Sequence, residues 1–459
     1  MLNNTPESDN AEMLADYALM LGGLCSEICK MKRYAMDRLM QWKNSKDRRP
    51  LLIMGARQVG KTWLMREFGH LAYQKTAYVS FFRNPRMKEV FEQDCDISRI
   101  IAGLNIETGI EITPGDTLII LDEIQEAPAV LEVLKYFCEN APEYHVCAAG
   151  SLLGVSLHEG VSFPVGKVAM LKLYPLHFRE YLEALGEVQL AQLLETGDYS
   201  IIDSFADKYL YWLKNYIYTG GLPAVVNFFR DHKDYAEVRR IQKEIVQQYQ
   251  GDFGKHIRAG ELKRINMVWE SIPIQLAKDN KKFFFGQIKK GARSAEFETA
   301  IQWLADAGLV YKVHRVNEPE MPLSAYKDFS AYKLFALDVG ILGALSDLDA
   351  RSILDGNDIF REFRGALAEQ YALQEMIAAT DYTPYYYGTA SASFEQDFII
   401  QKGKLTIPIE VKSGANVRSQ SLKAFIAKFH SEAAVRLSPL PYRKQETIIN
   451  LPLYAVCNL

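Results

Sequence analysis

The sequence has few of the features that mark secreted, zinc-binding or membrane proteins. Its 459 residues include only six cysteines, scattered without the second pair that would complete a zinc motif. No apolar run approaches the roughly 18 residues that a membrane-spanning helix needs. Residues 1–30 open with polar and acidic residues instead of the basic region of a secretory signal, and Met31 is a plausible alternative start. We therefore expect a reducing, cytoplasmic location, no membrane contact, and a functional core that begins after residue 30.

An excess of charge of either sign is also missing. Lys and Arg number 53 against 57 Asp and Glu, which gives a net charge of −4. The chain as a whole therefore lacks the positive surface of a protein that coats nucleic acid, so any contact with DNA or RNA has to be local. The chain is 48% hydrophobic and 24% charged, which is ordinary for globular material. Its length predicts about three domains.

A glycine-rich loop is the strongest motif. Residues 55–62 read Gly-Ala-Arg-Gln-Val-Gly-Lys-Thr and follow the apolar run of residues 51–54, so a buried strand leads through the loop into a helix. This order predicts a P-loop in which Lys61 contacts the β- and γ-phosphates of ATP and Thr62 ligates Mg²⁺. The candidate nucleotide-binding residues are Gly55, Ala56, Arg57, Gln58, Val59, Gly60, Lys61, Thr62 and Trp63. The alternative is a chance match in a turn rich in glycine and lysine.

A second apolar run strengthens the prediction. Residues 118–121 are all apolar and lead into Asp122 and Glu123, as at the end of a central parallel strand. Asp122 is predicted to hold Mg²⁺, and Glu123 to polarise the water that attacks the γ-phosphate. Alone, the pair is equally typical of a helix cap. A third run at 145–149 ends at Ser151, whose hydroxyl is a candidate γ-phosphate sensor, although a simple turn fits as well.

Two further strand-like runs, at 76–81 and 168–173, complete an expected five-stranded parallel sheet with helices on both faces. Residues 175–260 carry helical patterns broken at 219–223. A helical pattern from Ser294 to Leu304, a glycine turn and a short strand at 309–313 suggest a winged-helix module.

A basic cluster in this region is a candidate contact for nucleic-acid phosphates; it comprises Lys278, Lys281, Lys282, Lys289, Lys290 and Arg293. A solvated surface on a protein-docking module is the open alternative.

The last hundred residues hold a second chemical pattern. Residues 394–400 and 406–413 resemble a pair of adjoining strands around a turn at 402–404. They bring Asp397 close to Glu410, with Lys412 on the same face as Glu410. Two carboxylates can bind Mg²⁺ and a nearby lysine can orient a water. An Asp, a spacer and Glu-x-Lys, with the helical Glu369 before them, form the pattern of nucleases with the restriction-endonuclease fold. Surface salt bridges around Lys412 are the alternative.

Taken together, these motifs resemble bacterial and archaeal AAA+-type ATPases that end in a domain of unknown function with a restriction-endonuclease-like (PD-(D/E)XK) fold. The resemblance rests on residues 55–62, 121–125, 150–151, 173–178, 220–223, 333–338 and 409–414. Members tend to have arginine where this chain has Lys167. If that position is a finger for the γ-phosphate, hydrolysis here is slow or depends on Arg179, because lysine lacks the planar guanidinium fork.

The expected fold class is α/β, with five segments. An N-terminal extension (1–45) precedes a P-loop AAA+-like ATPase domain (46–185). A helical lid and connector (186–260), a winged-helix-like module (261–345) and a restriction-endonuclease-like domain (346–459) follow.

Two functions stay open at this stage. In the first, an ATPase with catalytic Lys61 and Glu123 couples nucleotide state to a nuclease-like site. That site is made of Glu369, Asp397, Glu410 and Lys412. It acts on nucleic acid that is bound by residues 278–293 and the C-terminal domain. In the second, the chain is an ATP-dependent switch whose C-terminal domain binds a protein or nucleic acid without cutting it. ATP and Mg²⁺ are the expected cofactors. The sequence leaves the oligomeric state open.

Overall fold

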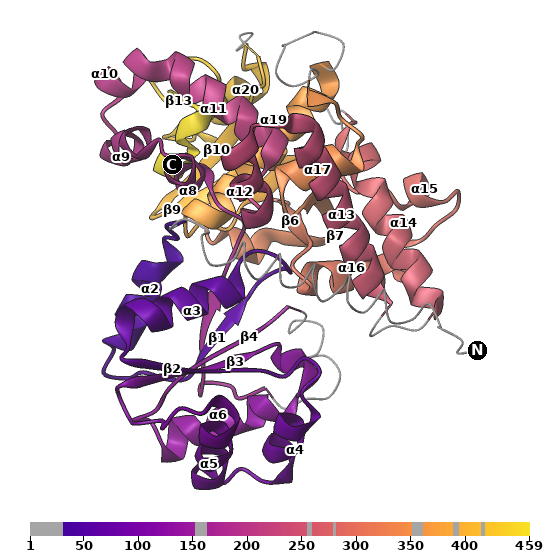
Figure 1. Cartoon of the computed structure of the whole chain (residues 1–459). Helices are drawn as coiled ribbons and strands as arrows, with labels where there is room; N and C mark the ends of the chain where they lie inside the picture. The colour runs from indigo at the N-terminus through magenta and orange to yellow at the C-terminus, as the bar shows by residue number, and fades with distance from the viewer. Residues whose placement is uncertain are drawn as a thin grey trace, which may run out of the picture.

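A computed structural model describes residues 31–151, 163–254, 259–278, 281–350, 361–388, 394–414 and 418–459. Residues 1–30 of the predicted N-terminal extension lie outside this range, as do residues 279 and 280 of the basic segment. The described chain forms two β-sheets separated by a helical region (Figure 1). The architecture is α/β, as expected.

The first sheet has five strands, all parallel, in the order β2-β3-β4-β1-β5. Its strands are β1 (Leu51–Met54), β2 (Lys75–Ser80), β3 (Thr117–Asp122), β4 (His145–Gly150) and β5 (Ala169–Lys172). On one face lie α2 (Ala35–Lys43) and α3 (Lys61–Ala72), and on the other α4 (Pro85–Gln93), α5 (Ile97–Thr108) and α6 (Ala129–Asn140) (Figure 1). The 3-10 turn η1 (Ile124–Glu126) follows β3. The predicted five-stranded parallel sheet is confirmed.

Helices pack on both faces of the first sheet, which explains why its strand β3 is apolar at successive positions. Leu118 and Ile120 of β3 belong to the hydrophobic cluster on the α3 side, whereas Ile119 and Leu121 belong to the cluster on the α4–α6 side. Every residue of β3 is buried. A strand buried on both faces reads as a continuous apolar run instead of an alternating one.

Between β5 and residue 306, the regular elements of the described residues are all helices. The helices are α8 (Phe178–Ala184), α9 (Val188–Thr196), α10 (Tyr199–Ile202), η2 (Asp203–Phe205), α11 (Ala206–Thr219), α12 (Pro223–His232), α13 (Tyr235–Phe253), α14 (Ala259–Leu276), α15 (Phe285–Ile288) and α16 (Ser294–Asp306). The expected break falls between α11 and α12. Pro223 suits the first position of a helix because its missing N–H would have no partner there.

The second sheet is mixed and has eight strands in the order β12-β13-β11-β10-β9-β8-β6-β7. Its strands are β6 (Val310–Val316), β7 (Lys327–Ala336), β8 (Tyr385–Gly388), β9 (Glu395–Lys402), β10 (Leu405–Val411), β11 (Ala434–Ser438), β12 (Arg443–Gln445) and β13 (Ile448–Pro452). The accompanying helices are η3 (Leu323–Tyr326), α17 (Val339–Leu345), α19 (Arg361–Ala379), α20 (Gln420–Phe429) and η5 (Leu453–Asn458).

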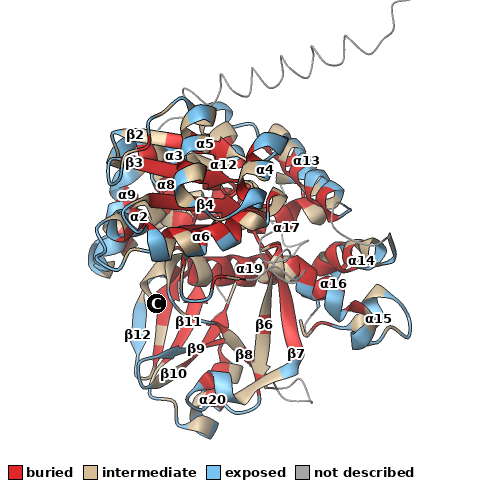
Figure 2. Ribbon diagram, turned by 90° about the horizontal axis from the view of Figure 1, so that it is seen from below, coloured by how far each residue is buried: buried red, intermediate tan, exposed pale blue. Residues whose placement is uncertain are grey.

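The expected helix, glycine turn and strand of the winged-helix segment are α16, the turn at Gly308 and β6. The hairpin β6–β7 then joins the C-terminal strands, because β6 pairs in parallel with β8. One hydrophobic cluster runs from Ile53 of the first sheet through Tyr216 of α11 to Ile409 of the second. Buried residues accordingly continue from one sheet through the helices to the other (Figure 2). The predicted domain boundaries stay predictions, and the helical region shares its core with both sheets.

Candidate functional site

The glycine-rich loop lies between β1 and α3, as the sequence predicts. Gly60 caps α3 in the left-handed conformation, with φ 94°. At Gly55 the backbone passes so close to β5 that an added Cβ would lie 2.3 Å from the carbonyl oxygen of Leu173. Only glycine fits there, because any side chain would collide with that backbone. The loop thus leads directly into the N-terminus of α3, an arrangement suited to phosphate.

Lys61 is buried at the start of α3. Its ammonium group donates to the carbonyl oxygens of Gly55 and Ala56, each at 2.8 Å. Burial lowers the pKa of Lys61 to about 8, although the nearby carboxylates of Glu123 and Asp122 oppose this effect. The ammonium is thus held inside the loop that would enclose the phosphates, and a phosphate group would provide the negative charge that favours its protonated form.

Asp122 ends β3 opposite Thr62. The hydroxyl of Thr62 donates to Asp122 Oδ2 at 2.6 Å, and the hydroxyl of Tyr78 donates to the same oxygen at 3.1 Å. Hydroxyl and carboxylate oxygens are ligands that Mg²⁺ prefers. The pair therefore fits the Mg²⁺ site that the sequence predicts. Tyr78 was not predicted; its place on β2, beside β3, becomes clear only once the strand order is known.

Glu123 follows Asp122 in the left-handed conformation, with φ 55°. Gln125 donates a hydrogen bond to Glu123 Oε2, and the Ser151 backbone N–H donates to Gln125 Oε1 at 3.3 Å. Ser151 is thus connected to Glu123 through Gln125. The sequence predicted the two end members and missed the amide between them, although Gln125 lies only two residues after Glu123.

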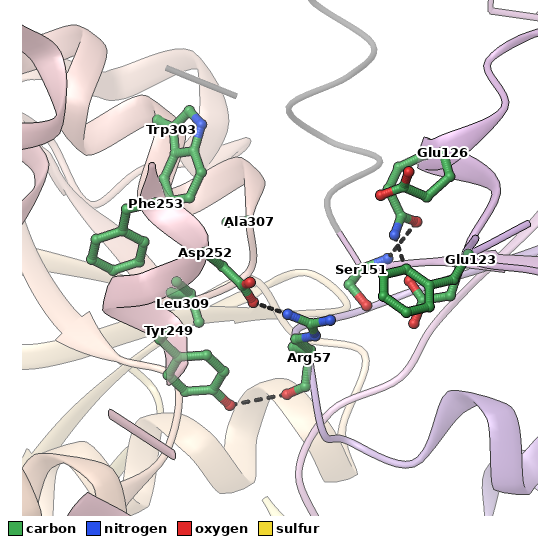
Figure 3. Close-up of a pocket in the computed structure, with 12 residues that line it drawn as sticks. Arg57, Glu123, Glu126, Ser151, Tyr249, Asp252, Phe253, Trp303, Ala307 and Leu309 are labelled. Atoms are coloured by element: carbon green, nitrogen blue, oxygen red, sulfur yellow. Dashed lines mark hydrogen bonds and ion pairs between the residues drawn. The ribbon is translucent and has the colours of Figure 1, made fainter. Parts of the chain in front are cut away.

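Helix α13 reaches the glycine-rich loop from the helical region. Asp252 forms an ion pair with Arg57, and the hydroxyl of Tyr249 donates to the Arg57 carbonyl oxygen at 2.9 Å (Figure 3). The turn before β6 also approaches the loop, since a Cβ on Gly308 would lie 3.2 Å from the backbone nitrogen of Ala56. The loop is therefore in contact with the segment that joins the two sheets.

A pocket lies at this junction (Figure 3). Its polar lining residues are Arg57, Glu123, Gln125, Glu126, Ser151 and Asp252, and its largely apolar ones are Phe82, Tyr249, Phe253, Trp303, Ala307 and Leu309. Residues of the first sheet and of α13 to β6 thus share one cavity beside the residue predicted to activate water.

Arg33 also contacts the loop, which was not predicted. Its guanidinium donates to the carbonyl oxygens of Val59 at 2.9 Å and Tyr174 at 2.7 Å, and to Glu180 Oε1 at 3.1 Å. Arg33 and Glu180 are each 4% exposed. No sequence motif includes an arginine so far upstream of the loop, so only the folded structure reveals that Arg33 contacts it.

The two predicted finger candidates lie elsewhere. Lys167 pairs with Glu139 at 2.9 Å, and Arg179 pairs with Glu195 at 2.7 Å. Within the described residues, neither side chain lines the pocket beside Glu123. A finger role for either residue stays a prediction.

The predicted C-terminal residues meet in a second pocket. Glu369 comes from α19, Asp397 from β9 and Glu410 from β10, with Lys412 directly after β10. β9 and β10 are antiparallel, and their register runs to the pair Phe398 and Ile409. The Val411 backbone N–H donates to Asp397 Oδ2 at 2.8 Å, and the Lys412 ammonium lies 2.9 Å from Glu410 Oε1. The pocket is also lined by Lys278, Lys281, Gly365, Glu395 and Ser421.

Two further lysines join these carboxylates. Lys281 pairs with Glu369, and the fully buried Lys333 lies 2.5 Å from Glu395 Oε1. The sequence predicted neither pairing. Glu395 stands two residues before Asp397 and so shares its face of β9, which is a signal that could have been used. Lys333 is distant in sequence and carries no such signal.

The charges of the pocket are partly compensated. Burial raises the pKa of Glu369, as does the neighbouring Asp397, while Lys281 and Lys333 oppose the rise. The Oε2 atoms of Glu369 and Glu410 are buried without a hydrogen-bond partner among the described residues. The same residues contain no group of three or more His, Cys, Asp and Glu arranged to hold a metal ion. Asp397 and Glu410 thus remain a candidate pair of Mg²⁺ ligands.

The basic cluster divides into two parts. Lys278, Lys289, Lys290 and Arg293 are exposed. Lys282 is half-buried, and the Lys281 side chain is only 12% exposed and pairs with Glu369. The first four are therefore the side chains that a phosphate backbone could reach, and Lys281 departs from the expected surface role.

Comparison with known families finds three matches along the chain. Residues 47–182 match an AAA domain, residues 210–352 a domain of unknown function (DUF8612), and residues 364–455 a second domain of unknown function (DUF4143). These matches identify an AAA-type P-loop ATPase domain followed by two domains of unknown function. No curated protein matches the chain.

Solved structures show distant similarity. A Walker-type ATPase of Pyrococcus abyssi is 14% identical, with a TM-score of 0.46 over 69% of this chain and 96% of that one. The Orc1 protein of Aeropyrum pernix in complex with DNA is 14% identical, with a TM-score of 0.28 over 68% and 91%. A RuvB variant of Thermotoga maritima is 15% identical, with a TM-score of 0.28 over 62% and 88%. Similarity this low supports no conclusion about function.

Among the residues that the structure describes, none of the helices has the length and apolar character needed to cross a bilayer.

Proposed function

We propose that this protein hydrolyses ATP and uses nucleotide state to control a metal-dependent, nuclease-like site in its C-terminal domain. The observation that carries the proposal is that one segment contacts both sites. Asp252, at the end of α13, pairs with Arg57 of the P-loop, and Lys281, after α14, pairs with Glu369 in the C-terminal pocket. Because α13 and α14 also contact each other, a change at the P-loop has a physical route toward the second site.

The ATP site holds the groups that phosphoryl transfer needs. Lys61 would contact the β- and γ-phosphates, and Thr62 and Asp122 would hold Mg²⁺, which neutralises charge on the phosphates. Glu123, fixed by its hydrogen bond from Gln125, would orient the attacking water and accept its proton. The Ser151–Gln125 contact would link the γ-phosphate region to the position of Glu123.

The C-terminal elements support the nuclease-like assignment. Helix α19, the antiparallel strands β8, β9 and β10, helix α20 and the parallel strand β11 follow one another. This order resembles the core of the restriction-endonuclease-like fold, with Glu369 on its first helix and Asp397, Glu410 and Lys412 at its central strands. Asp397 and Glu410 would bind a divalent cation, and Lys412 would stabilise charge on the phosphate being attacked.

A binding function without cleavage is the second candidate. The net charge of −4 and the lysine partners of Glu369, Glu395 and Glu410 favour it. A pocket whose carboxylates are neutralised by lysines could hold a partner without activating water. In that case the ATPase would act as a switch for a protein or nucleic-acid partner.

One set of reactions separates the two candidates. Purified protein is incubated with circular and linear DNA and RNA, with Mg²⁺ or Mn²⁺, with and without ATP. Glu123→Gln and Asp397→Asn serve as paired variants, each keeping nearly the size of the side chain. We expect Glu123→Gln to bind ATP with turnover reduced at least ~100-fold, and Asp397→Asn to lose cleavage but keep ATP turnover.

Unchanged turnover in Glu123→Gln would remove the assigned role of that carboxylate. No cleavage by the wild type under any condition, combined with nucleotide-dependent binding of nucleic acid or of a protein, would select the switch. ATP turnover is measured separately from cleavage, so the two parts of the proposal can fail independently.

A further inference from the structure

Lys281 reaches the C-terminal pocket from a different part of the chain than the carboxylates that form it. It lies before α15, on the segment between α14 and α16, whereas Glu369 belongs to α19 and the remaining acids to β9 and β10. The ion pair with Glu369 therefore connects two segments 88 residues apart in sequence. A movement of either segment would separate the pair.

The pair is buried and its acid is incompletely satisfied. The Lys281 side chain is 12% exposed and the Glu369 side chain 6%. Glu369 Oε2 is buried without a hydrogen-bond partner among the described residues, and Glu410 Oε2 is in the same condition. Both carboxylates line the pocket. Unpartnered buried carboxylate oxygens in one cavity indicate that a further cationic ligand could bind there.

The charges in the pocket show what Lys281 does to it. Four carboxylates line the pocket, from Glu369, Glu395, Asp397 and Glu410. Three lysines pair with three of them, namely Lys281, Lys333 and Lys412, and a fourth lysine, Lys278, also lines the pocket. These groups together are neutral. Without Lys281 the same groups leave one negative charge, next to the unpartnered oxygens of Glu369 and Glu410, which favours a bound cation.

We propose that Lys281 is a latch whose ammonium group occupies the cation-binding region next to Glu369, so that Lys281 and a divalent cation exclude each other. The latch rests on the proposed metal-binding function of this pocket and adds its regulation. When Lys281 withdraws, Glu369 is released and the cation binds. When the segment returns, the ammonium displaces the cation.

A purely structural ion pair is the competing explanation. Such a pair would hold the two segments together and would leave the affinity for a cation unchanged. Breaking it would destabilise the fold, because Glu369 would lose its partner. Stability alone does not distinguish the two explanations, whereas cation affinity does.

The first measurement is Mn²⁺ binding to nucleotide-free full-length protein, by isothermal titration calorimetry. The variants are Lys281→Met and, as a matched control with the same change of charge, Lys289→Met, whose lysine is exposed on the same segment. A variant with both Asp397→Asn and Glu410→Gln gives the background from other sites. We expect Lys281→Met to bind Mn²⁺ at least ~10-fold more tightly than the wild type, because a nearby positive charge is removed, and Lys289→Met to bind like the wild type.

The second measurement does not depend on a variant that folds. Wild-type protein is labelled by reductive methylation with and without Mn²⁺, and the modified lysines are quantified by mass spectrometry. We expect Mn²⁺ to increase labelling of Lys281 several-fold, since its ammonium is displaced from Glu369. Labelling of Lys289 should stay unchanged.

The outcomes separate the latch from the site itself. Equal Mn²⁺ affinity in the wild type, Lys281→Met and Lys289→Met, above the background variant, would overturn the latch and leave the metal site standing. Weaker binding in Lys281→Met, or unchanged labelling of Lys281 on saturation with Mn²⁺, would also overturn it. Binding at background level in every protein would refute the metal site, and the latch with it.

Discussion

Replacing Glu375 by glutamine should make the protein more stable at neutral pH. Glu375 of α19 is 1% exposed and accepts a hydrogen bond from the Phe178 backbone N–H at 2.6 Å. Burial raises its pKa from the usual 4.5 to about 8, with the N–H of Phe178 opposing the shift and Glu180 adding to it. Glutamine keeps the shape and the acceptor oxygen but has no proton to lose.

The sign follows from comparing the two states of the chain. Above pH 4.5 the unfolded chain ionises Glu375, whereas the folded protein keeps it protonated until about pH 8. The folded state therefore binds more protons, and stability falls as the pH rises through this window. Each pH unit costs about 1.4 kcal/mol, so the loss is about 1 kcal/mol at pH 5 and about 3 kcal/mol at pH 7. That loss is a large fraction of a typical folding free energy, roughly 5–15 kcal/mol.

The assay is urea unfolding of the wild type and Glu375→Gln at pH 5, 6, 7 and 8, followed by circular dichroism. We expect the stability difference in favour of the variant to grow by about 2 kcal/mol between pH 5 and pH 7. Glu432→Gln, which changes an exposed glutamate of the same domain, is the control and should give no such trend. Parallel stability curves for the wild type and Glu375→Gln would refute the reasoning, because they would mean that Glu375 is ionised in the folded protein.

Two further predictions concern the segment between the two sites. Asp252→Asn removes the charge that pairs with Arg57; the Asp252 side chain is 12% exposed and the Arg57 side chain 39%. Asparagine keeps an acceptor oxygen in a side chain of nearly the same size, so the loss of stability should be about 1 kcal/mol, while any effect of ATP on labelling of Lys281 should be abolished. A retained ATP effect would show that the coupling takes another route. If the exposed basic cluster binds DNA, Lys289→Ala and Lys290→Ala should each reduce the salt dependence of binding by about one unit, as measured by fluorescence anisotropy. Lys281→Ala should leave the slope unchanged, and an equal effect of all three would contradict the buried position of Lys281.

The first sheet could be predicted from sequence because its signals are local. The run at 118–121 is apolar at every position, as expected of a strand buried on both faces. The predicted site residues lie close to strand ends in the sequence, and they are Lys61, Thr62, Asp122 and Glu123. Contiguous motifs of this kind fix both the elements and their chemistry. The bond between Thr62 and Asp122 at 2.6 Å is therefore where the motifs place it.

The residues that the sequence missed act across long distances in the chain. Arg33 contacts the loop carbonyl of Val59, Asp252 pairs with Arg57, and Lys281 pairs with Glu369, the last two across 195 and 88 residues. Such contacts depend on how the helical region packs, and no periodicity or spacing encodes that packing. The same reason explains why β6 and β7 joined the C-terminal sheet without any signal for the pairing of β6 with β8.

Buried hydrogen bonds hold helix α19 in place. Gln370 makes two hydrogen bonds to the backbone of Ala336, at 3.0 and 2.7 Å, and Gln374 accepts from the Val339 N–H at 2.9 Å and donates to Asp338 at 3.0 Å. These amides are fully buried, so displacing α19 would leave several buried polar groups without partners at once, at a cost of about 1–3 kcal/mol for each.

The contact of α13 with the P-loop is different. It depends on Arg57, whose side chain is 39% exposed, so water can replace its partner when the pair opens. Nearer its start, α13 is anchored, because the fully buried Gln242 donates to the carbonyl oxygens of Tyr218 and Thr219 at 2.9 and 2.8 Å. A nucleotide-dependent movement therefore costs least at the C-terminal end of α13, beside Arg57. We expect ATP binding to move this end and, through it, Lys281, while Glu369 stays in place with α19.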